Sequence, residues 1–311
     1  MSVAFHGAKY CWLNGEITET DKALVSAMEP IHLGIYEGIK AYVEGKNLLG
    51  EGRLNVFGWK PHLDRLWLSA RVDGLKVNYT TDTLLEAVRE LVRLNEFKTN
   101  VYIQPRVWPK ANQQDEYHLL IPVWKFETML GKNNPVFGKK RRFMVSSWRR
   151  IASDALPPQA KSWGNYANTR LGANEARRLG YDGPIFLDAR GFVSEGAVAS
   201  IMSVRDGAVI TPPVTASILE SVTRNTLLRF ISEDLNIPVQ VRDLTRVELY
   251  ASDEIFLCGT NVEVTPVTSI DDMEIGAQYP GPVTTRIADY YSDIVSGNVQ
   301  KWKSWLTPIS Q

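Results

Sequence analysis

The sequence contains only two cysteines, Cys11 and Cys258, among its 311 residues. Two cysteines are too few for a disulfide framework and are typical of a protein of the reducing cytosol. No apolar run approaches the roughly 18 residues that a membrane-spanning helix needs, and the N-terminus lacks the apolar stretch of a signal peptide. We therefore expect a cytoplasmic protein without a membrane segment.

The sequence also lacks an excess of charge of either sign. Lysine plus arginine and aspartate plus glutamate each number 35, so the formal net charge is zero and nothing favours nucleic acid or a membrane surface as a partner. The one basic run, residues 139–142, is typical of a solvated linker. Hydrophobic residues make up 44% of the chain, which is enough for a substantial core and, at this length, for two domains.

Periodicity and turn residues indicate helices and strands that mix without regular alternation. Apolar residues at helical spacing predict helices over residues 62–77, 82–94, 166–179 and 221–235. Alternation and turn signals predict strands over residues 12–17 (with a turn), 101–107, 117–124, 142–148, 184–188, 191–195, 201–204, 208–211 and 253–257. This mixture favours an α+β arrangement over a doubly wound sheet.

A shift in composition indicates where domains meet. Between residues 127 and 142 the chain becomes rich in Gly, Lys, Asn and Pro, which is typical of a linker. We expect a small N-terminal domain over residues 1–130, a linker over 131–141 and a larger domain over 142–311.

Four polar positions lie at the ends of predicted elements, where a rigid scaffold usually presents reactive groups. Lys161 lies between a proline break and a helix, and Glu195 ends a strand. Ser221-Val222-Thr223 opens a helix whose N–H groups are suited to hold a phosphate. Gly259-Thr260-Asn261 is a donor-rich turn. Each position alone also has an ordinary interpretation: a solvated lysine, a turn carboxylate, a helix cap by Ser221 and a plain turn.

A series of short motifs occurs in order along nearly the whole chain. They are Tyr36-Glu37-Gly38-Ile39, His62-Leu63-Asp64-Arg65-Leu66, Ser69-Ala70, Ala160-Lys161, Gly164-Asn165-Tyr166, Ser194-Glu195-Gly196, Thr211-Pro212-Pro213, Thr223-Arg224, Gly259-Thr260 and Gly281-Pro282-Val283-Thr284. In this order they resemble the class IV (fold type IV) pyridoxal-phosphate enzymes, and most closely the branched-chain amino acid aminotransferases. The resemblance implies an α+β fold with a smaller N-terminal and a larger C-terminal domain.

The resemblance also implies a catalytic group and its cofactor. Lys161 would form an imine with pyridoxal 5′-phosphate and would move the proton between the substrate Cα and the cofactor. Glu195 would face the pyridine nitrogen of the cofactor and keep it protonated. Tyr166 would hydrogen-bond the ring oxygen O3′.

A second group of residues is implied for the cofactor phosphate. Arg65, the backbone at Val222 and Thr223, and Thr260 would hold it. By helical phase alone, Arg65 lies opposite the apolar stripe of its predicted helix and is expected to point to solvent.

The match is weaker around the substrate. Tyr102 keeps a position that the family associates with the substrate carboxylate, but Gln104 stands where an arginine usually contacts the second carboxylate of glutamate. A neutral glutamine loses that bidentate charged pairing. Arg106 lies two residues on, and we expect it either to replace the missing cation or to point to solvent. Asn261 adds bulk and polarity beside Thr260.

Two further departures leave the substrate open. His32 occupies a loop that usually contains tyrosine, glycine and threonine, either as a pocket residue or as a packed loop histidine. Ser221 stands where glycine is common. The leading interpretation is transamination between an aliphatic, branched-chain-like L-amino acid and a 2-oxo acid such as 2-oxoglutarate, by a homodimer or higher homo-oligomer. The alternatives are an (R)-amine or D-amino-acid transaminase, a shifted substrate in a biosynthetic pathway, a pyridoxal-phosphate lyase and a non-catalytic relative.

Overall fold

The computed structural model describes residues 8–23, 25–26, 28–45, 52–111, 116–131 and 134–310. The chain divides into two compact units. The first unit is formed by Met1–Thr128, Ala160–Gly164 and Asp293–Gln311, and the second by Met129–Gln159 and Asn165–Ser292. Residues 132 and 133 of the expected linker lie outside the described part of the chain. No helix within the described ranges is long and apolar enough to cross a membrane.

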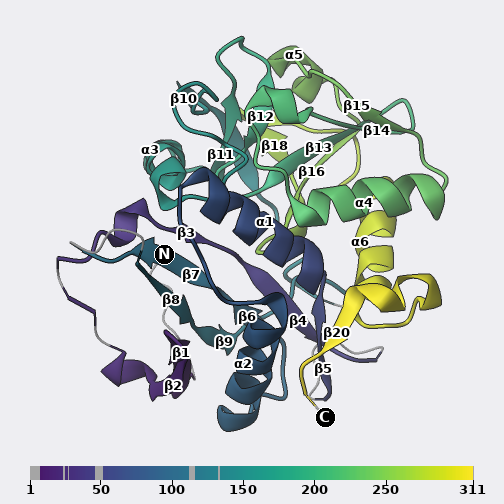
Figure 1. The fold of residues 1–311 in the computed structure, drawn as a ribbon. Helices are drawn as coiled ribbons and strands as arrows, with labels where there is room; N and C mark the ends of the chain where they lie inside the picture. The colour runs from purple at the N-terminus through teal and green to yellow at the C-terminus, as the bar shows by residue number, and fades with distance from the viewer. Residues whose placement is uncertain are drawn as a thin grey trace. The chain divides into compact units, whose positions relative to one another are not determined.

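Four helices of the described residues largely follow the predicted segments, whereas α5 and α6 were not predicted (Figure 1). The helices are α1 (Trp59–Val72), α2 (Thr81–Leu94), α3 (Trp163–Arg178), α4 (Val222–Glu233), α5 (Arg246–Tyr250) and α6 (Pro282–Val295), with short 3-10 helices at Thr20–Lys22 (η1), Ile31–Leu33 (η2), Val214–Ala216 (η3) and Gln300–Trp305 (η4). The side chain of Thr80 caps α2 by accepting the Thr83 N–H at 3.1 Å. Helix α1 ends earlier than predicted, because Gly74 adopts a left-handed φ of 74° just after it.

Two five-stranded antiparallel sheets form in the first unit, with orders β2-β1-β8-β7-β3 and β20-β5-β4-β6-β9. Their strands are β1 (Tyr10–Leu13), β2 (Glu16–Glu19), β3 (Ile35–Tyr36), β4 (Ile39–Val43), β5 (Leu54–Phe57), β6 (Val101–Ile103), β7 (Arg106–Pro109), β8 (Tyr117–Ile121), β9 (Val123–Lys125) and β20 (Leu306–Pro308). The prediction of a single strand over residues 101–107 is wrong. It is broken at Gln104-Pro105, and β6 and β7 enter different sheets because proline cannot donate to a ladder.

The first unit also takes two segments that the sequence analysis assigned to the larger domain. Strand β20 pairs with β5 and lies beside it, at the yellow end of the chain in Figure 1. The segment Ala160–Gly164 joins the same unit through backbone hydrogen bonds to Gly34 and Tyr36. Helix α1 contacts β3, and α2 contacts β1 and β9, so their apolar faces complete the core of this unit.

The second unit contains two further sheets, with orders β12-β11-β10-β18-β19 and β15-β14-β13-β16-β17. The strands are β10 (Arg142–Arg149), β11 (Gly183–Leu187), β12 (Val193–Gly196), β13 (Ser200–Arg205), β14 (Ala208–Thr211), β15 (Val239–Val241), β16 (Glu254–Gly259), β17 (Glu263–Pro266), β18 (Ser269–Ile270) and β19 (Met273–Glu274). Parallel pairs (β10 with β11 and β18, β14 with β15) occur beside antiparallel ones. Helix α4 contacts β15 and β16.

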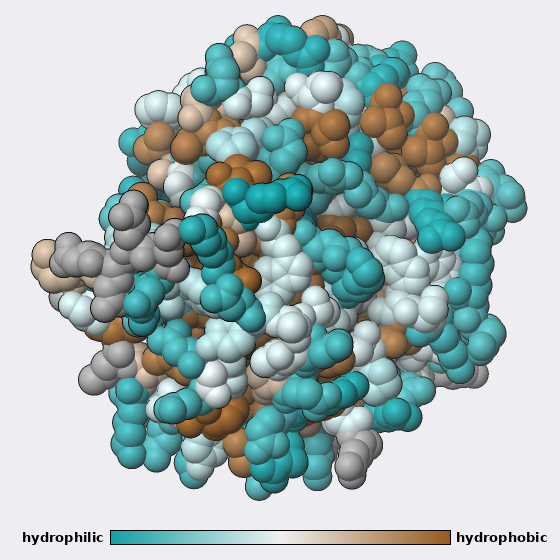
Figure 2. All heavy atoms as spheres, in the orientation of Figure 1, coloured by the Kyte–Doolittle hydropathy of each residue, from teal (hydrophilic) through white to brown (hydrophobic). Residues whose placement is uncertain are grey.

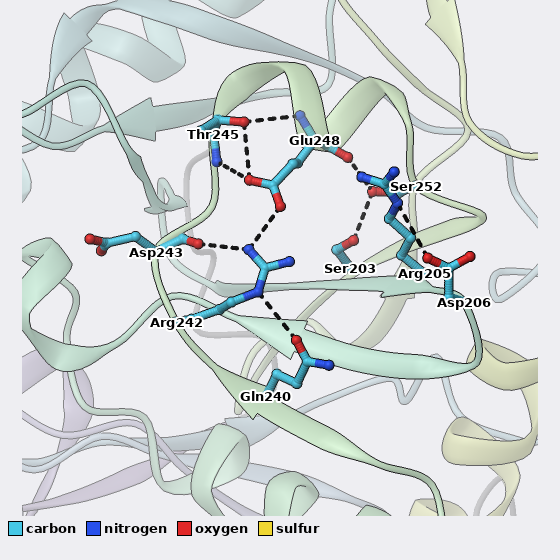
Figure 3. Close-up of polar contacts among 9 residues, drawn as sticks. All are labelled: Ser203, Arg205, Asp206, Gln240, Arg242, Asp243, Thr245, Glu248 and Ser252. Carbon is cyan, nitrogen blue, oxygen red and sulfur yellow. Dashed lines mark hydrogen bonds and ion pairs between the residues drawn. The ribbon is translucent and has the colours of Figure 1, made fainter.

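A polar network fixes the short helix α5 to the end of β15 (Figure 3). Thr245 accepts the Glu248 N–H at 3.3 Å through Oγ1, while the Thr245 N–H donates to Glu248 Oε2 at 2.9 Å. The other carboxylate oxygen of Glu248 accepts from Arg242 at 2.8 Å. This capping box satisfies N–H groups that a five-residue helix cannot pair internally.

The surface is mixed in character. On the face drawn in Figure 2, hydrophobic residues form small groups between hydrophilic ones. Large apolar side chains that are exposed include Leu179, which directly follows α3, and Trp148 and Leu156. Single exposed apolar residues are ordinary for a folded protein.

Candidate functional site

Both peptide groups of Lys161 are held in place. Its N–H donates to Ser69 Oγ at 2.9 Å, and its carbonyl accepts the Tyr36 N–H at 3.1 Å. Its Nζ lies 4.7 Å from the centroid of the Tyr36 ring, within the range of a cation–π contact. The lysine is half-buried, so the ordinary interpretation as a solvated loop lysine is wrong.

An aromatic stack extends from Tyr36 toward the predicted substrate residues. The rings of Tyr36 and Trp163 stack with centroids 4.1 Å apart. The Arg106 guanidinium carbon lies 5.8 Å from the Trp163 ring, and Arg106 Nε donates to Gln104 Oε1 at 2.7 Å. Burial lowers the pKa of Arg106, and the phenols of Tyr36 and Tyr102 oppose that change. Arg106 is therefore held against Trp163 and does not simply point to solvent.

Tyr102 lies close to the turn between β3 and β4. It is buried on β6, with its ring 4.9 Å from that of Trp124. A Cβ atom placed on Gly38 would lie 1.9 Å from the Tyr102 hydroxyl oxygen, so only glycine allows this approach. The glycine of the Glu-Gly motif thus makes room for the predicted substrate residue.

Lys40 was missed by the sequence analysis, although it is the cross-strand partner of Tyr102. Lys40 is only 2% exposed, and its Nζ lies 3.4 Å from the centroid of the Phe126 ring. A lysine between apolar neighbours in a strand was the available signal, because buried lysines are rare.

Arg65 is directed to a carboxylate and not to solvent, so the expectation from helical phase is wrong. Arg65 Nε donates to Glu37 Oε1 at 2.6 Å and its Nη2 donates to Glu37 Oε2 at 2.8 Å. His62 Nδ1 lies 2.8 Å from Glu37 Oε2. The segment that carries Glu37 covers this face of α1, which phase alone could not predict. The sequence indicated Glu37 and His62 only as members of motifs. Their pairing could not be predicted, because it joins residues far apart in sequence.

The electrostatics of this cluster favour an ionised Glu37. Burial alone would raise the pKa of Glu37, but the charge of Arg65 and the hydrogen bonds from His62 and Arg65 outweigh it and lower that pKa to about 2. Burial lowers the pKa of His62, which its contact with Glu37 opposes. The cluster therefore contains a carboxylate and a guanidinium beside a histidine that favours its neutral form.

In the second unit, Glu195 is buried at the end of β12. It is 5% exposed, and its Oε1 accepts from Arg150 Nε at 2.8 Å. Its Oε2 accepts the Leu219 N–H at 3.2 Å. Glu195 therefore lies beside the segment that leads into α4 and is no exposed turn carboxylate. The sequence analysis missed Arg150. It follows the strand predicted over residues 142–148, and nothing in the sequence indicates its pairing with Glu195.

The N-terminus of α4 is capped as the ordinary interpretation predicted. Ser221 Oγ accepts the Arg224 N–H at 3.2 Å. Val222 and Thr223 occupy the first turn, where N–H groups have no partner within a helix. The buried Arg224 side chain donates to Thr211 Oγ1 at 3.3 Å and to the Pro212 carbonyl at 2.8 Å, so these hydrogen bonds join the two motifs.

The remaining predicted residues are placed by their elements. Thr260 and Asn261 lie in the turn between β16 and β17, with Thr260 half-buried and Asn261 exposed. Tyr166 is half-buried in α3. His32 lies in η2 and is exposed, so it is not a packed loop histidine.

Comparison with known proteins gives a consistent match. The profile described as amino-transferase class IV matches residues 34–270. The chain is 34% identical to the branched-chain-amino-acid aminotransferase of Escherichia coli strain K12 over 98% of each chain. It is similarly 34% identical to a probable branched-chain-amino-acid aminotransferase of Aquifex aeolicus over 96% of each chain.

Solved structures agree. The holo-form branched-chain amino acid aminotransferase of Thermobaculum terrenum, in its PLP form, aligns with a TM-score of 0.91 and 32% identity, covering 98% of this chain and 99% of that one. The branched-chain aminotransferase of Thermoproteus uzoniensis with norvaline aligns with a TM-score of 0.88 and 38% identity, covering 97% and 100%. The α+β fold expected from the sequence is confirmed.

Proposed function

Because this chain belongs to the class IV aminotransferase family, we propose that it is a pyridoxal-phosphate-dependent aminotransferase that acts on branched-chain amino acids. These matches confirm the resemblance of its motifs to this family. The observation that carries the proposal is the fixed position of Lys161, which is held at both peptide groups with its amine over Tyr36.

The donor groups of the chain fit the cofactor. Pyridoxal phosphate needs an amine to hold it, a carboxylate for its pyridine nitrogen and cationic or N–H donors for its phosphate. Lys161 supplies the amine, Glu195 a buried carboxylate, and Arg65 a guanidinium. The first turn of α4, at Val222 and Thr223, supplies N–H groups.

The proposed mechanism assigns one task to each residue. When bound, the cofactor supplies an electron sink that stabilises negative charge at the substrate Cα. Lys161 Nζ would hold the cofactor and, once freed from it, would take the proton from Cα as a general base. Glu195 keeps a proton on the pyridine nitrogen, and Arg150 fixes the Glu195 carboxylate. Tyr166 hydrogen-bonds the ring oxygen.

The remaining roles concern the phosphate and the substrate. Arg65 and Thr260 hold the phosphate together with the α4 backbone. Tyr102 contacts the substrate carboxylate, and Asn261 lies toward the substrate beside Thr260. Arg106 provides the cation for the second carboxylate of an acceptor such as 2-oxoglutarate. Its hydrogen bond to Gln104 supports this role, because it orients the guanidinium.

We also infer a homodimer or higher homo-oligomer in the cytoplasm. The resemblance of the motifs to the class IV enzymes supports the oligomer. The two cysteines are buried free thiols, which supports a reducing compartment.

A spectrum and a donor screen test the proposed function. The purified protein should absorb visible light, and the absorbance should change when a branched-chain L-amino acid is added. Donors of both configurations, each tested with pyruvate and 2-oxoglutarate, distinguish it from (R)-amine and D-amino-acid transaminases. Lys161→Ala should lose colour and turnover, whereas Lys60→Ala, at an exposed lysine of α1, should keep both. A colourless Lys161→Ala protein that still transaminated would refute the mechanism.

A further inference from the structure

Ser69 connects two groups to which the proposed function gives separate tasks. It lies in α1 and is fully buried at 0% exposure. Its hydroxyl is 2.9 Å from the Arg65 carbonyl oxygen and 2.9 Å from the Lys161 amide nitrogen. A carbonyl can only accept and an amide N–H can only donate, so the direction of both hydrogen bonds is determined. Ser69 donates to Arg65 and accepts from Lys161.

These contacts belong to a closed circuit of interactions within the first unit. From Ser69 the circuit continues to Arg65, whose side chain is bound by Glu37. Glu37 follows Tyr36, and the Tyr36 N–H donates back to the Lys161 carbonyl at 3.1 Å. The backbone of Lys161 is therefore tied at both sides to the cluster that holds the Arg65 guanidinium.

We propose that Ser69 is a positioning residue for Lys161: its hydroxyl fixes the lysine main chain to helix α1 so that Nζ is held for proton transfer. This inference rests on the proposed function. A serine hydroxyl that only bonds back to the carbonyl four residues earlier needs no outside partner. The second hydrogen bond, to Lys161, is what this position adds.

Positioning should affect one kinetic step more than the others. Proton transfer depends on the position of the reacting amine to a fraction of an ångström, whereas the proposed function gives the buried Ser69 no contact with the substrate. Loss of the hydroxyl also leaves the Lys161 N–H in buried surroundings without its acceptor. We expect kcat to fall while KM is preserved.

Three variants separate the hydrogen bond from its surroundings. Ser69→Ala removes the hydroxyl and leaves a small gap, and Ser69→Cys replaces it with a thiol, a much weaker hydrogen-bonding group, while filling the space. Ser162→Ala is the matched control, because Ser162 follows Lys161 and donates to Asp73 Oδ2 at 2.7 Å without touching the Lys161 backbone. It removes a side-chain hydrogen bond at the next residue and leaves the hydrogen bond between Ser69 and Lys161 in place.

Both Ser69 variants should lower kcat of the holoenzyme about tenfold and change KM for donor and acceptor by less than about twofold. Hydrogen exchange of the peptide around Lys161 should accelerate in both, with or without cofactor, while Ser162→Ala behaves as the wild type in each assay. A normal Ser69→Cys enzyme, an unchanged kcat in Ser69→Ala, or a Ser162→Ala protein that matches Ser69→Ala would overturn the proposal. Failure of the proposed function would show separately, as a colourless and inactive wild-type protein.

Discussion

Glu37 and Arg65 form a bidentate ion pair, with Nε to Oε1 at 2.6 Å and Nη2 to Oε2 at 2.8 Å. The carboxylate is fully buried, and the Arg65 side chain is 10% exposed. The pair joins two motifs that the sequence separates by more than twenty residues. Such a pair orients the guanidinium and at the same time makes each charge depend on the other.

Glu37→Gln should destabilise the protein, because it leaves the Arg65 charge poorly compensated. Breaking a buried pair by removing one partner costs on the order of 3 kcal/mol. Urea denaturation at pH 7 measures the change. The matched control is Glu44→Gln, whose pairing with Arg53 at 3.9 Å is exposed and should contribute less than about 1 kcal/mol. Equal losses in the two variants would contradict the assignment.

The same carboxylate predicts a dependence of stability on pH. Its folded pKa of about 2 lies below the ordinary value of 4.5, so folding favours the ionised form. The stabilisation is present above about pH 4.5 and is lost as the pH falls toward 2. The difference in unfolding free energy between wild type and Glu37→Gln should therefore shrink across that window. Urea denaturation at several pH values tests this, and a constant difference from pH 6 to pH 3 would be inconsistent with it.

The sequence could predict local features of this fold but not the contacts that complete the site. Helices α2 and α4 follow from apolar spacing and a capping residue within the same segment. The pairing of β20 with β5 joins residues about 250 positions apart, and no local pattern records it. The direction of the Arg65 side chain was misjudged for a similar reason. Helical phase identifies only the apolar face of α1, whereas the segment that carries Glu37 covers another face of the same helix.

The motif that begins at Gly281 has a structural role in helix α6. Glu254 accepts the Val283 N–H at 2.9 Å and the Thr284 N–H at 2.7 Å, so its carboxylate caps the helix. A Cβ atom on Gly281 would lie 2.0 Å from the carboxyl carbon of Glu254. Gly281→Ala should displace that carboxylate.

We expect Gly281→Ala to lower the free energy of unfolding by about 1–3 kcal/mol. Gly138→Ala is the control, because a Cβ atom there meets nothing within 4 Å. Thermal and urea unfolding of both variants give the comparison. A neutral Gly281→Ala would mean that Glu254 does not hold the helix end.

Two helix caps separate stability from cofactor binding. Ser221 caps α4 and Thr245 caps α5 in the same way. Replacing either with alanine should cost about 1 kcal/mol of stability. Only Ser221→Ala should also weaken cofactor binding, by roughly three- to tenfold, since the N–H groups of α4 are proposed to hold the phosphate. Absorbance titration of cofactor-depleted protein measures this, and equal affinities in the two variants would argue against the α4 phosphate site.

Arg106→Ala tests the proposed recognition of a dicarboxylate acceptor. A charge-assisted hydrogen bond contributes about 1.5–3 kcal/mol, so kcat/KM for 2-oxoglutarate should fall by roughly 10- to 100-fold. Activity with 4-methyl-2-oxopentanoate, which has no second carboxylate, should change by less than about threefold on the same argument. Gln104→Ala should give a smaller loss in the same direction, because it releases Arg106 without removing the charge. Arg93→Ala, at an exposed arginine of α2, is the control. If Arg106→Ala left both KM and turnover for 2-oxoglutarate unchanged, the cation for the second carboxylate would have to come from another residue.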